Sequence, residues 1–112
     1  MTAKKRRHGE QRFYALLEEM AALHEKKSRD YGGTVDPLAN LRASADFGVS
    51  PFLATIVRLH DKIARLKTFC RTGKLANEGV EDSLRDIGVY SQLALILFRE
   101  ACDAKAPARR KP

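Results

Sequence analysis

The sequence predicts an all-α fold: a helical bundle of three long helices and one short helix, completed by oligomerisation. Three observations predict it. Apolar residues recur every three or four positions in three long segments, glycine and X-Pro pairs mark the segment ends, and no segment alternates polar and apolar residues with period two. We expect this fold to occupy residues 13–102, between two basic disordered tails, residues 1–12 and 103–112.

End signals and apolar spacing predict the first two helices. The first starts at Phe13, carries a single apolar stripe and stops near Asp30, where an Asp-Tyr-Gly-Gly sequence begins. The second is short, with Asp36 as its expected N-cap, Pro37 as its first residue and Gly48 at its end.

The third and fourth helices are predicted to be long. Ser50-Pro51 repeats the N-cap and proline start signal, and Gly73 marks the end of the third helix. A loop over residues 74–80 leads into the fourth helix, which runs to about Cys102. The fourth helix contains six consecutive apolar residues, 93–98, and three other helices of this size cannot easily enclose them. We therefore expect a second copy to complete the bundle; the alternative is a monomer in which this helix is central.

The net charge of +7 lies entirely in the two tails. Residues 1–12 hold five basic and one acidic side chain, and residues 103–112 hold four basic and one acidic. Residues 13–102 hold 12 of each sign and have no net charge. A nucleic-acid partner suggested by basicity would therefore bind the tails.

Cysteine spacing and hydropathy indicate the compartment. Cys70 and Cys102 show neither Cys-x-x-Cys nor His-x-x-His spacing, which argues against a disulfide framework and a zinc site. No stretch approaches the roughly 18 apolar residues of a membrane span, and no apolar segment follows the basic N-terminus. We expect a cytoplasmic protein with no membrane partner.

Two aspartates fall on the predicted apolar side of the fourth helix. Asp82, Asp86 and Tyr90 follow one another at helical spacing on a line that continues through Leu93 and Leu97. Two partly desolvated carboxylates one turn apart repel each other unless a cation or a shared proton lies between them, and Mg²⁺ suits such oxygen ligands. Alternatively, Asp82 favours the helix N-terminus through the macrodipole and Asp86 pairs with a neighbouring arginine.

The third helix carries cations on one arc. Arg58, Lys62 and Arg65 project together, with Asp61 at the edge of the arc. The arc is either a solvated basic face or a set of phosphate ligands.

The end of the first helix offers another cation. Lys27 lies in line with the apolar stripe, where it either extends along the helix end or reaches a buried anion. The loop that follows, with Asp30 and Tyr31, can supply an aromatic face and backbone amides for a base or a phosphate.

Together these motifs resemble a known family. They are Lys27-x-x-Asp30-Tyr31-Gly32, Asp36-Pro37-x-x-Asn40, Arg58-x-x-Asp61-Lys62-x-x-Arg65 and Glu78-x-x-x-Asp82-x-x-x-Asp86-x-x-x-Tyr90. The chain from about residue 13 to 102 resembles the nucleotide modification associated domain 1 family of phage and prophage proteins, which is similar to the MazG-type and dimeric-dUTPase-type all-alpha nucleoside triphosphate pyrophosphatases.

The resemblance implies an all-alpha, commonly oligomeric fold in which helix-borne carboxylates hold Mg²⁺ on the phosphates of a nucleotide. Glu78, Asp82 and Asp86 occupy the family's final acidic motif. The paired glutamates of MazG-type enzymes have no counterpart here, because Glu18 and Glu25 are predicted to face water.

The leading hypothesis is a Mg²⁺-dependent hydrolase that cleaves a nucleoside or deoxynucleoside triphosphate to the monophosphate and pyrophosphate, in phage-type nucleotide metabolism in the host cytoplasm. The expected metal ligands are Asp61, Glu78, Asp82 and Asp86. The expected catalytic groups are Asp82, Asp86, Lys62 and Arg65, and the expected substrate contacts are Lys27, Asp30, Tyr31, Asn40 and Arg58. The alternatives are a non-catalytic nucleotide-binding or nucleic-acid-modification accessory protein, and a small nucleic-acid-binding protein that acts through its basic tails. A homodimer or tetramer is expected.

Overall fold

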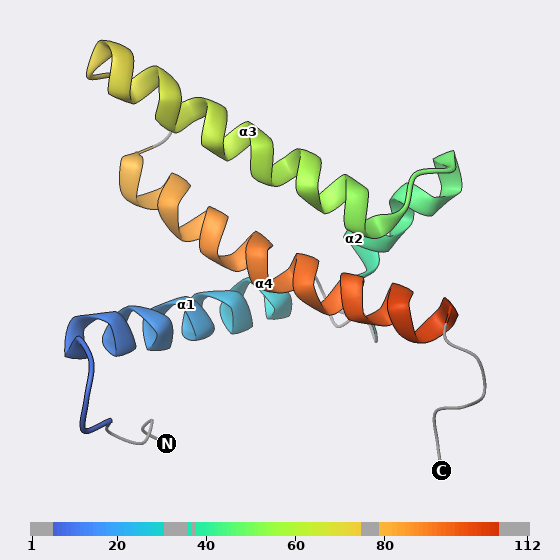
Figure 1. The fold of residues 1–112 in the computed structure, drawn as a ribbon, viewed down its shortest axis with the longest axis horizontal. Coiled ribbons are helices and arrows are strands. Elements are labelled where there is room, and N and C mark those ends of the chain that lie inside the picture. The colour runs from blue at the N-terminus through green and yellow to red at the C-terminus, as the bar shows by residue number, and fades with distance from the viewer. Residues whose placement is uncertain (1–5, 31–35, 37, 75–78, 106–112) are drawn as a thin grey trace. The chain divides into compact units, whose positions relative to one another are not determined.

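The computed structural model describes residues 6–30, 36, 38–74 and 79–105. The elements in this part of the chain are α1 (Gln11–Asp30), α2 (Ala39–Arg42), the 3-10 helix η1 (Ala43–Phe47), α3 (Pro51–Thr72) and α4 (Val80–Lys105) (Figure 1). The predicted all-α class is confirmed, and no strand occurs within the described ranges. None of the described helices combines the length and the apolar character that a membrane crossing requires. The chain divides into two units, Met1–Pro37 and Leu38–Pro112, which are treated separately below.

The first unit contains α1, which begins at Gln11, two residues before the predicted start. Glu10 caps this end: its carboxylate accepts hydrogen bonds from the backbone N–H of Arg12 at 3.1 Å and from the Nε of Arg12 at 2.8 Å. Arg12 in turn lowers the pKa of Glu10. The Tyr14 hydroxyl donates to the carbonyl of His8 at 2.8 Å. Residues 8–10 thus contact the first helical turn directly.

The predicted N-cap of the short helix is wrong. The helix begins at Ala39, with Leu38 in the N-cap position and no side-chain hydrogen bond at the cap. Asp36 therefore does not cap it. Pro37 lies outside the described residues. Leu38 is buried in the core of the second unit, and its carbonyl accepts from the N–H groups of Leu41 and Arg42. The burial of Leu38 therefore sets the start of this helix. The Asp36-Pro37 pair does not predict that burial. The segment continues as η1 and ends at Gly48 in the left-handed region, φ 76°, as predicted.

The second unit is built on an antiparallel hairpin of α3 and α4 (Figure 1). The Ser50 hydroxyl caps α3 by accepting from the N–H of Leu53 at 3.0 Å, and Gly73 ends it with φ 77°, so both predicted ends are confirmed. α4 begins at Val80, the end of the predicted loop, and runs to Lys105, three residues beyond the predicted end. Thr55 and Ser83 are completely buried on the sides where the two helices meet.

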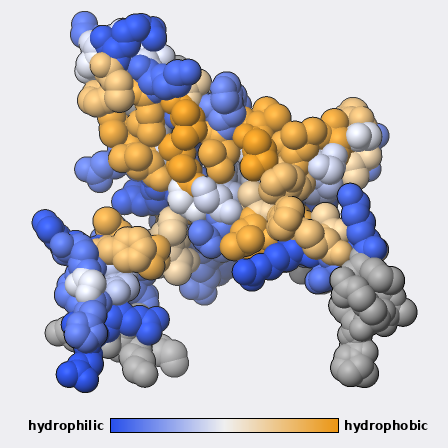
Figure 2. Space-filling view, viewed as in Figure 1, coloured by the Kyte–Doolittle hydropathy of each residue, from blue (hydrophilic) through white to orange (hydrophobic). Residues whose placement is uncertain are grey.

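The core of the second unit is small. Leu38 and Leu41 pack on Leu97 of α4, with Phe52 and Tyr90 among the half-buried residues around them. Among the described residues only four apolar side chains are buried, whereas fourteen large ones are exposed, nine of them on α3 and α4. Hydrophobic residues accordingly cover much of the face of α3 and α4 seen in Figure 2.

Candidate functional site

An ion pair between Lys62 and Asp86 joins the two long helices. The Lys62 Nζ lies 3.0 Å from the Asp86 Oδ2, and the two side chains are only 18% and 23% exposed. Lys62 points toward α4 because it is seven residues, close to two helical turns, after the buried Thr55. The prediction left open whether Lys62 belongs to a solvated basic face. For Lys62 that alternative is wrong.

Further charged side chains lie near this pair along the two helices: Arg58 and Arg65 share a helical arc with Lys62, and Asp82 and Arg85 are within about one turn of Asp86. Arg65 is half-buried, whereas Arg58 is exposed to solvent. On α4, the Nη1 of Arg85 lies 3.8 Å from the Oδ1 of Asp82. Asp61 is a further, exposed carboxylate at the edge of the same arc of α3, so basic and acidic side chains are mixed on this surface.

The two predicted metal-binding aspartates differ in environment. Asp86 is partly desolvated, as predicted, but the Asp82 side chain is 66% exposed because it lies in the first turn of α4, on a side that α3 does not cover. Asp82 lies in the first turn of α4, the position that the alternative interpretation concerns, and that interpretation stays a prediction. The partner of Asp86 is a lysine of α3 rather than an arginine.

The described carboxylates do not form a metal-binding cluster by themselves. Asp61 is exposed on α3, and Glu78 lies outside the described residues. Within those residues, no three potential metal-ligating side chains come together. One or two carboxylates completed by water and phosphate oxygens are a common way to bind Mg²⁺, and Asp86 with Asp82 fits that pattern. The predicted set of four carboxylates stays a prediction.

The predicted substrate contacts are distributed over both units. Asn40 is exposed on α2, in the same unit as the Lys62–Asp86 pair. Lys27 is exposed near the end of α1, in the other unit. The side chain of Asp30 and the whole of Tyr31 lie outside the described residues. Their role in substrate binding stays a prediction.

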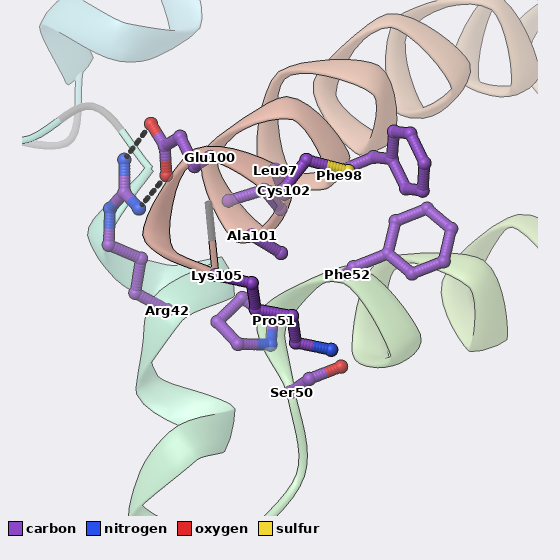
Figure 3. Close-up of a pocket in the computed structure, with 10 residues that line it drawn as sticks. All are labelled: Arg42, Ser50, Pro51, Phe52, Leu97, Phe98, Glu100, Ala101, Cys102 and Lys105. Atoms are coloured by element: carbon purple, nitrogen blue, oxygen red, sulfur yellow. Dashed lines mark hydrogen bonds and ion pairs between the residues drawn. The ribbon is translucent and has the colours of Figure 1, made fainter. Parts of the chain in front are cut away.

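A second ion pair, not predicted from the sequence, connects α2 to the end of α4. Arg42 donates to the two carboxylate oxygens of Glu100, at 2.5 Å from Nη1 and 3.1 Å from Nη2 (Figure 3). This bidentate geometry is the strongest form of an arginine–carboxylate contact. The partners are 58 residues apart in sequence, so no local spacing could have revealed them.

The Arg42–Glu100 pair borders a cleft of about 500 Å³ at the open end of the hairpin. The rings of Phe52 and Phe98 lie on the opposite side of the cleft, 5.7 Å apart, and Lys105 reaches toward it (Figure 3). The volume falls in the range of small-molecule pockets. The polar groups of the ion pair already satisfy each other, so the cleft offers mainly apolar surface and one ammonium group.

Comparison of the chain with protein-family models, with curated proteins and with solved structures finds no match. The resemblance to the nucleotide modification associated domain 1 family therefore stays a prediction.

Proposed function

We propose that the chain is a Mg²⁺-dependent nucleoside triphosphate pyrophosphohydrolase whose site is centred on Lys62 and Asp86. The observation that carries the proposal is the half-buried ion pair of these two residues, which joins α3 to α4 beside further cations. A triphosphate bound with Mg²⁺ needs both kinds of group at one place: a carboxylate for the metal and cations for the phosphate oxygens.

Contacts to a bound metal and phosphate can replace the Lys62–Asp86 contact at a small cost in free energy. With side chains 18% and 23% exposed, this pair lies between an exposed and a fully buried ion pair. Separating Lys62 from Asp86 therefore costs about 1–2 kcal/mol, which new contacts to a metal and a phosphate can offset. Asp86, helped by Asp82, would turn to the metal, and Lys62 would donate to a phosphate oxygen together with Arg65. Arg58, exposed at the edge of the same face, can reach phosphate groups that extend into solvent.

Bound Mg²⁺ would neutralise the phosphates and lower the pKa of a coordinated water. The protein's own contribution is positional. Lys62 and Arg65 lie about one turn apart on α3 and can hold two oxygens of the phosphate chain. Their fixed positive charges stabilise the negative charge that develops on the leaving pyrophosphate.

The test is pyrophosphate release by the purified full chain from a panel of ribo- and deoxyribonucleoside triphosphates. We expect release with Mg²⁺ and none after chelation. Asp86→Asn should abolish release, because an amide is a weak Mg²⁺ ligand. Asp103→Asn, the same change at an exposed position near the end of α4, is the matched control and should retain full activity. No release from any nucleotide, or an active Asp86→Asn variant, would contradict the proposal.

A second candidate is a nucleotide-binding protein without catalysis. The exposure of Asp82 favours this candidate. Of the predicted metal ligands that the structure describes, Asp61, Asp82 and Asp86, only Asp86 is partly desolvated. Calorimetry of a triphosphate with Mg²⁺, followed by chromatography of the recovered nucleotide, separates the two. Binding that depends on Lys62 with intact nucleotide recovered supports the binding protein over the enzyme.

A further inference from the structure

The cleft at the open end of the hairpin lies apart from the Lys62–Asp86 pair. Cys102, which lines the cleft, lies beyond Asp86 on α4 by about 24 Å along the helix axis, at about 1.5 Å per residue. The residues that line the cleft all belong to the second unit and come from α2, the start of α3 and the last turns of α4. The proposed triphosphate site uses none of them. The cleft is therefore a separate place at which a ligand can bind.

Apolar side chains form most of the cleft wall. Phe52 at the start of α3 and Phe98 on α4 lie with their ring centroids 5.7 Å apart and their planes tilted by 56°. Because the rings are tilted rather than stacked, part of their surface stays accessible, and Phe98 is 49% exposed. Pro51 and Ala101 continue the wall (Figure 3). An aromatic or aliphatic body that rests here removes this surface from water, which favours binding.

Two polar side chains of the cleft suit a negatively charged group. Lys105 extends from the last turn of α4 toward Ser50 at the start of α3 (Figure 3). Within the described ranges, Lys105 forms no ion pair. The Ser50 hydroxyl accepts from the N–H of Leu53 at 3.0 Å, and no described acceptor takes its own proton. An ammonium group and a hydroxyl proton are both donors, so together they fit a group that only accepts, such as a carboxylate.

The acidic residue of the cleft is already neutralised. Glu100 is the one carboxylate among the lining residues, and its two oxygens accept from Arg42 at 2.5 Å and 3.1 Å. These two charges cancel, so the lining residues carry one net positive charge, that of Lys105. A single anionic group bound beside Lys105 therefore completes the charge balance of the cleft, and an apolar body suits the rest of its wall.

We infer that the cleft binds a small monocarboxylic acid with an apolar body, such as a medium-chain fatty acid or an arylalkanoic acid. The body rests on Phe52 and Phe98, and the carboxylate accepts from Lys105 and Ser50. The volume of about 500 Å³ falls among those of small-molecule sites. A nucleoside triphosphate is a poorer occupant, because its several negative charges would meet one ammonium group and a mainly apolar wall. The inference does not rest on the proposed function.

The test is protection of Cys102 from alkylation in the full chain, with octanoate and 4-phenylbutanoate as probes. Both cysteines are exposed, but only Cys102 lines the cleft, so Cys70 is an internal control. Mass spectrometry after timed iodoacetamide treatment gives the alkylation rate at each thiol. We expect either acid at saturation to slow alkylation of Cys102 and to leave Cys70 unchanged. 4-Phenylbutanol should need about a tenfold higher concentration, because it lacks the charge that Lys105 binds. Equal rates at both thiols with and without either acid would overturn the inference.

Two pairs of variants locate the bound acid. Lys105→Gln should raise the concentration for half-protection about tenfold, whereas Lys67→Gln, the same change at an exposed position on α3, should not alter it. Ala101→Trp fills the cleft from an exposed position and should abolish the effect of the acid, whereas Ala64→Trp, outside the cleft, should retain it. Circular dichroism verifies that each variant keeps its helices. Protection that survives both Lys105→Gln and Ala101→Trp unchanged would overturn the inference, because the acid then binds elsewhere.

Discussion

Replacing Lys62 by methionine tests whether the Lys62–Asp86 ion pair contributes to folding as well as to the proposed site. Methionine keeps most of the apolar stem, which packs between α3 and α4, and removes the charge. Exposed ion pairs contribute up to about 1 kcal/mol, and breaking a fully buried pair costs about 3–5 kcal/mol. With side chains 18% and 23% exposed and a 3.0 Å contact, this pair lies between those limits. We expect Lys62→Met to lower the free energy of unfolding by about 1–2 kcal/mol.

The assay is urea unfolding of a double-mutant cycle made from Lys62→Met and Asp86→Asn, at one fixed protein concentration in case association is linked to folding. The coupling energy should be about 1 kcal/mol. Arg85→Met with Asp82→Asn is the matched cycle: its contact is 3.8 Å long and Asp82 is 66% exposed, so its coupling should stay below about 0.5 kcal/mol. Equal coupling in the two cycles would refute the reasoning that burial strengthens the Lys62–Asp86 pair.

Two further predictions concern the helix ends. Ser50→Ala should destabilise the chain by about 1 kcal/mol in urea unfolding, because it removes the cap of α3; Ser28→Ala, inside α1, is the comparison, and equal losses would contradict a capping role. Arg12 lowers the pKa of Glu10 from its ordinary value of 4.5, so the capping interaction is fully present above that pH and is lost as the pH falls through the lowered pKa. A carbon-detected NMR titration should show this shift and its disappearance in Arg12→Ala; an unchanged titration would contradict it.

Signals carried by neighbouring residues predicted the structure well. Ser50-Pro51 and the two left-handed glycines, Gly48 and Gly73, specify their helix ends through backbone geometry and hydrogen bonds to residues within about one turn, so the sequence alone sufficed. Asp36-Pro37 carries the same type of signal and failed. The burial of Leu38 against α4 competes with it and is a tertiary contact.

The candidate site was predictable only in part, for the same reason. Helical spacing placed Arg58, Lys62 and Arg65 on one arc, but which edge of the arc meets α4 depends on how the two helices pack. That packing directs Lys62 to Asp86 and leaves Arg58 in solvent. The exposure of Asp82 likewise depends on where α4 begins relative to α3. The periodicity of residues within α4 does not predict that position.

The contact of Lys62 on α3 with Asp86 on α4 restricts how the length of either helix can change. Each inserted residue turns the rest of a helix by about 100°. A single insertion in the middle of α3, between Arg58 and Lys62, would rotate Lys62 away from Asp86. Seven inserted residues would nearly restore the register, because they make almost two complete turns. An insertion within either helix is therefore expected to separate Lys62 from Asp86, unless its length restores the helical register.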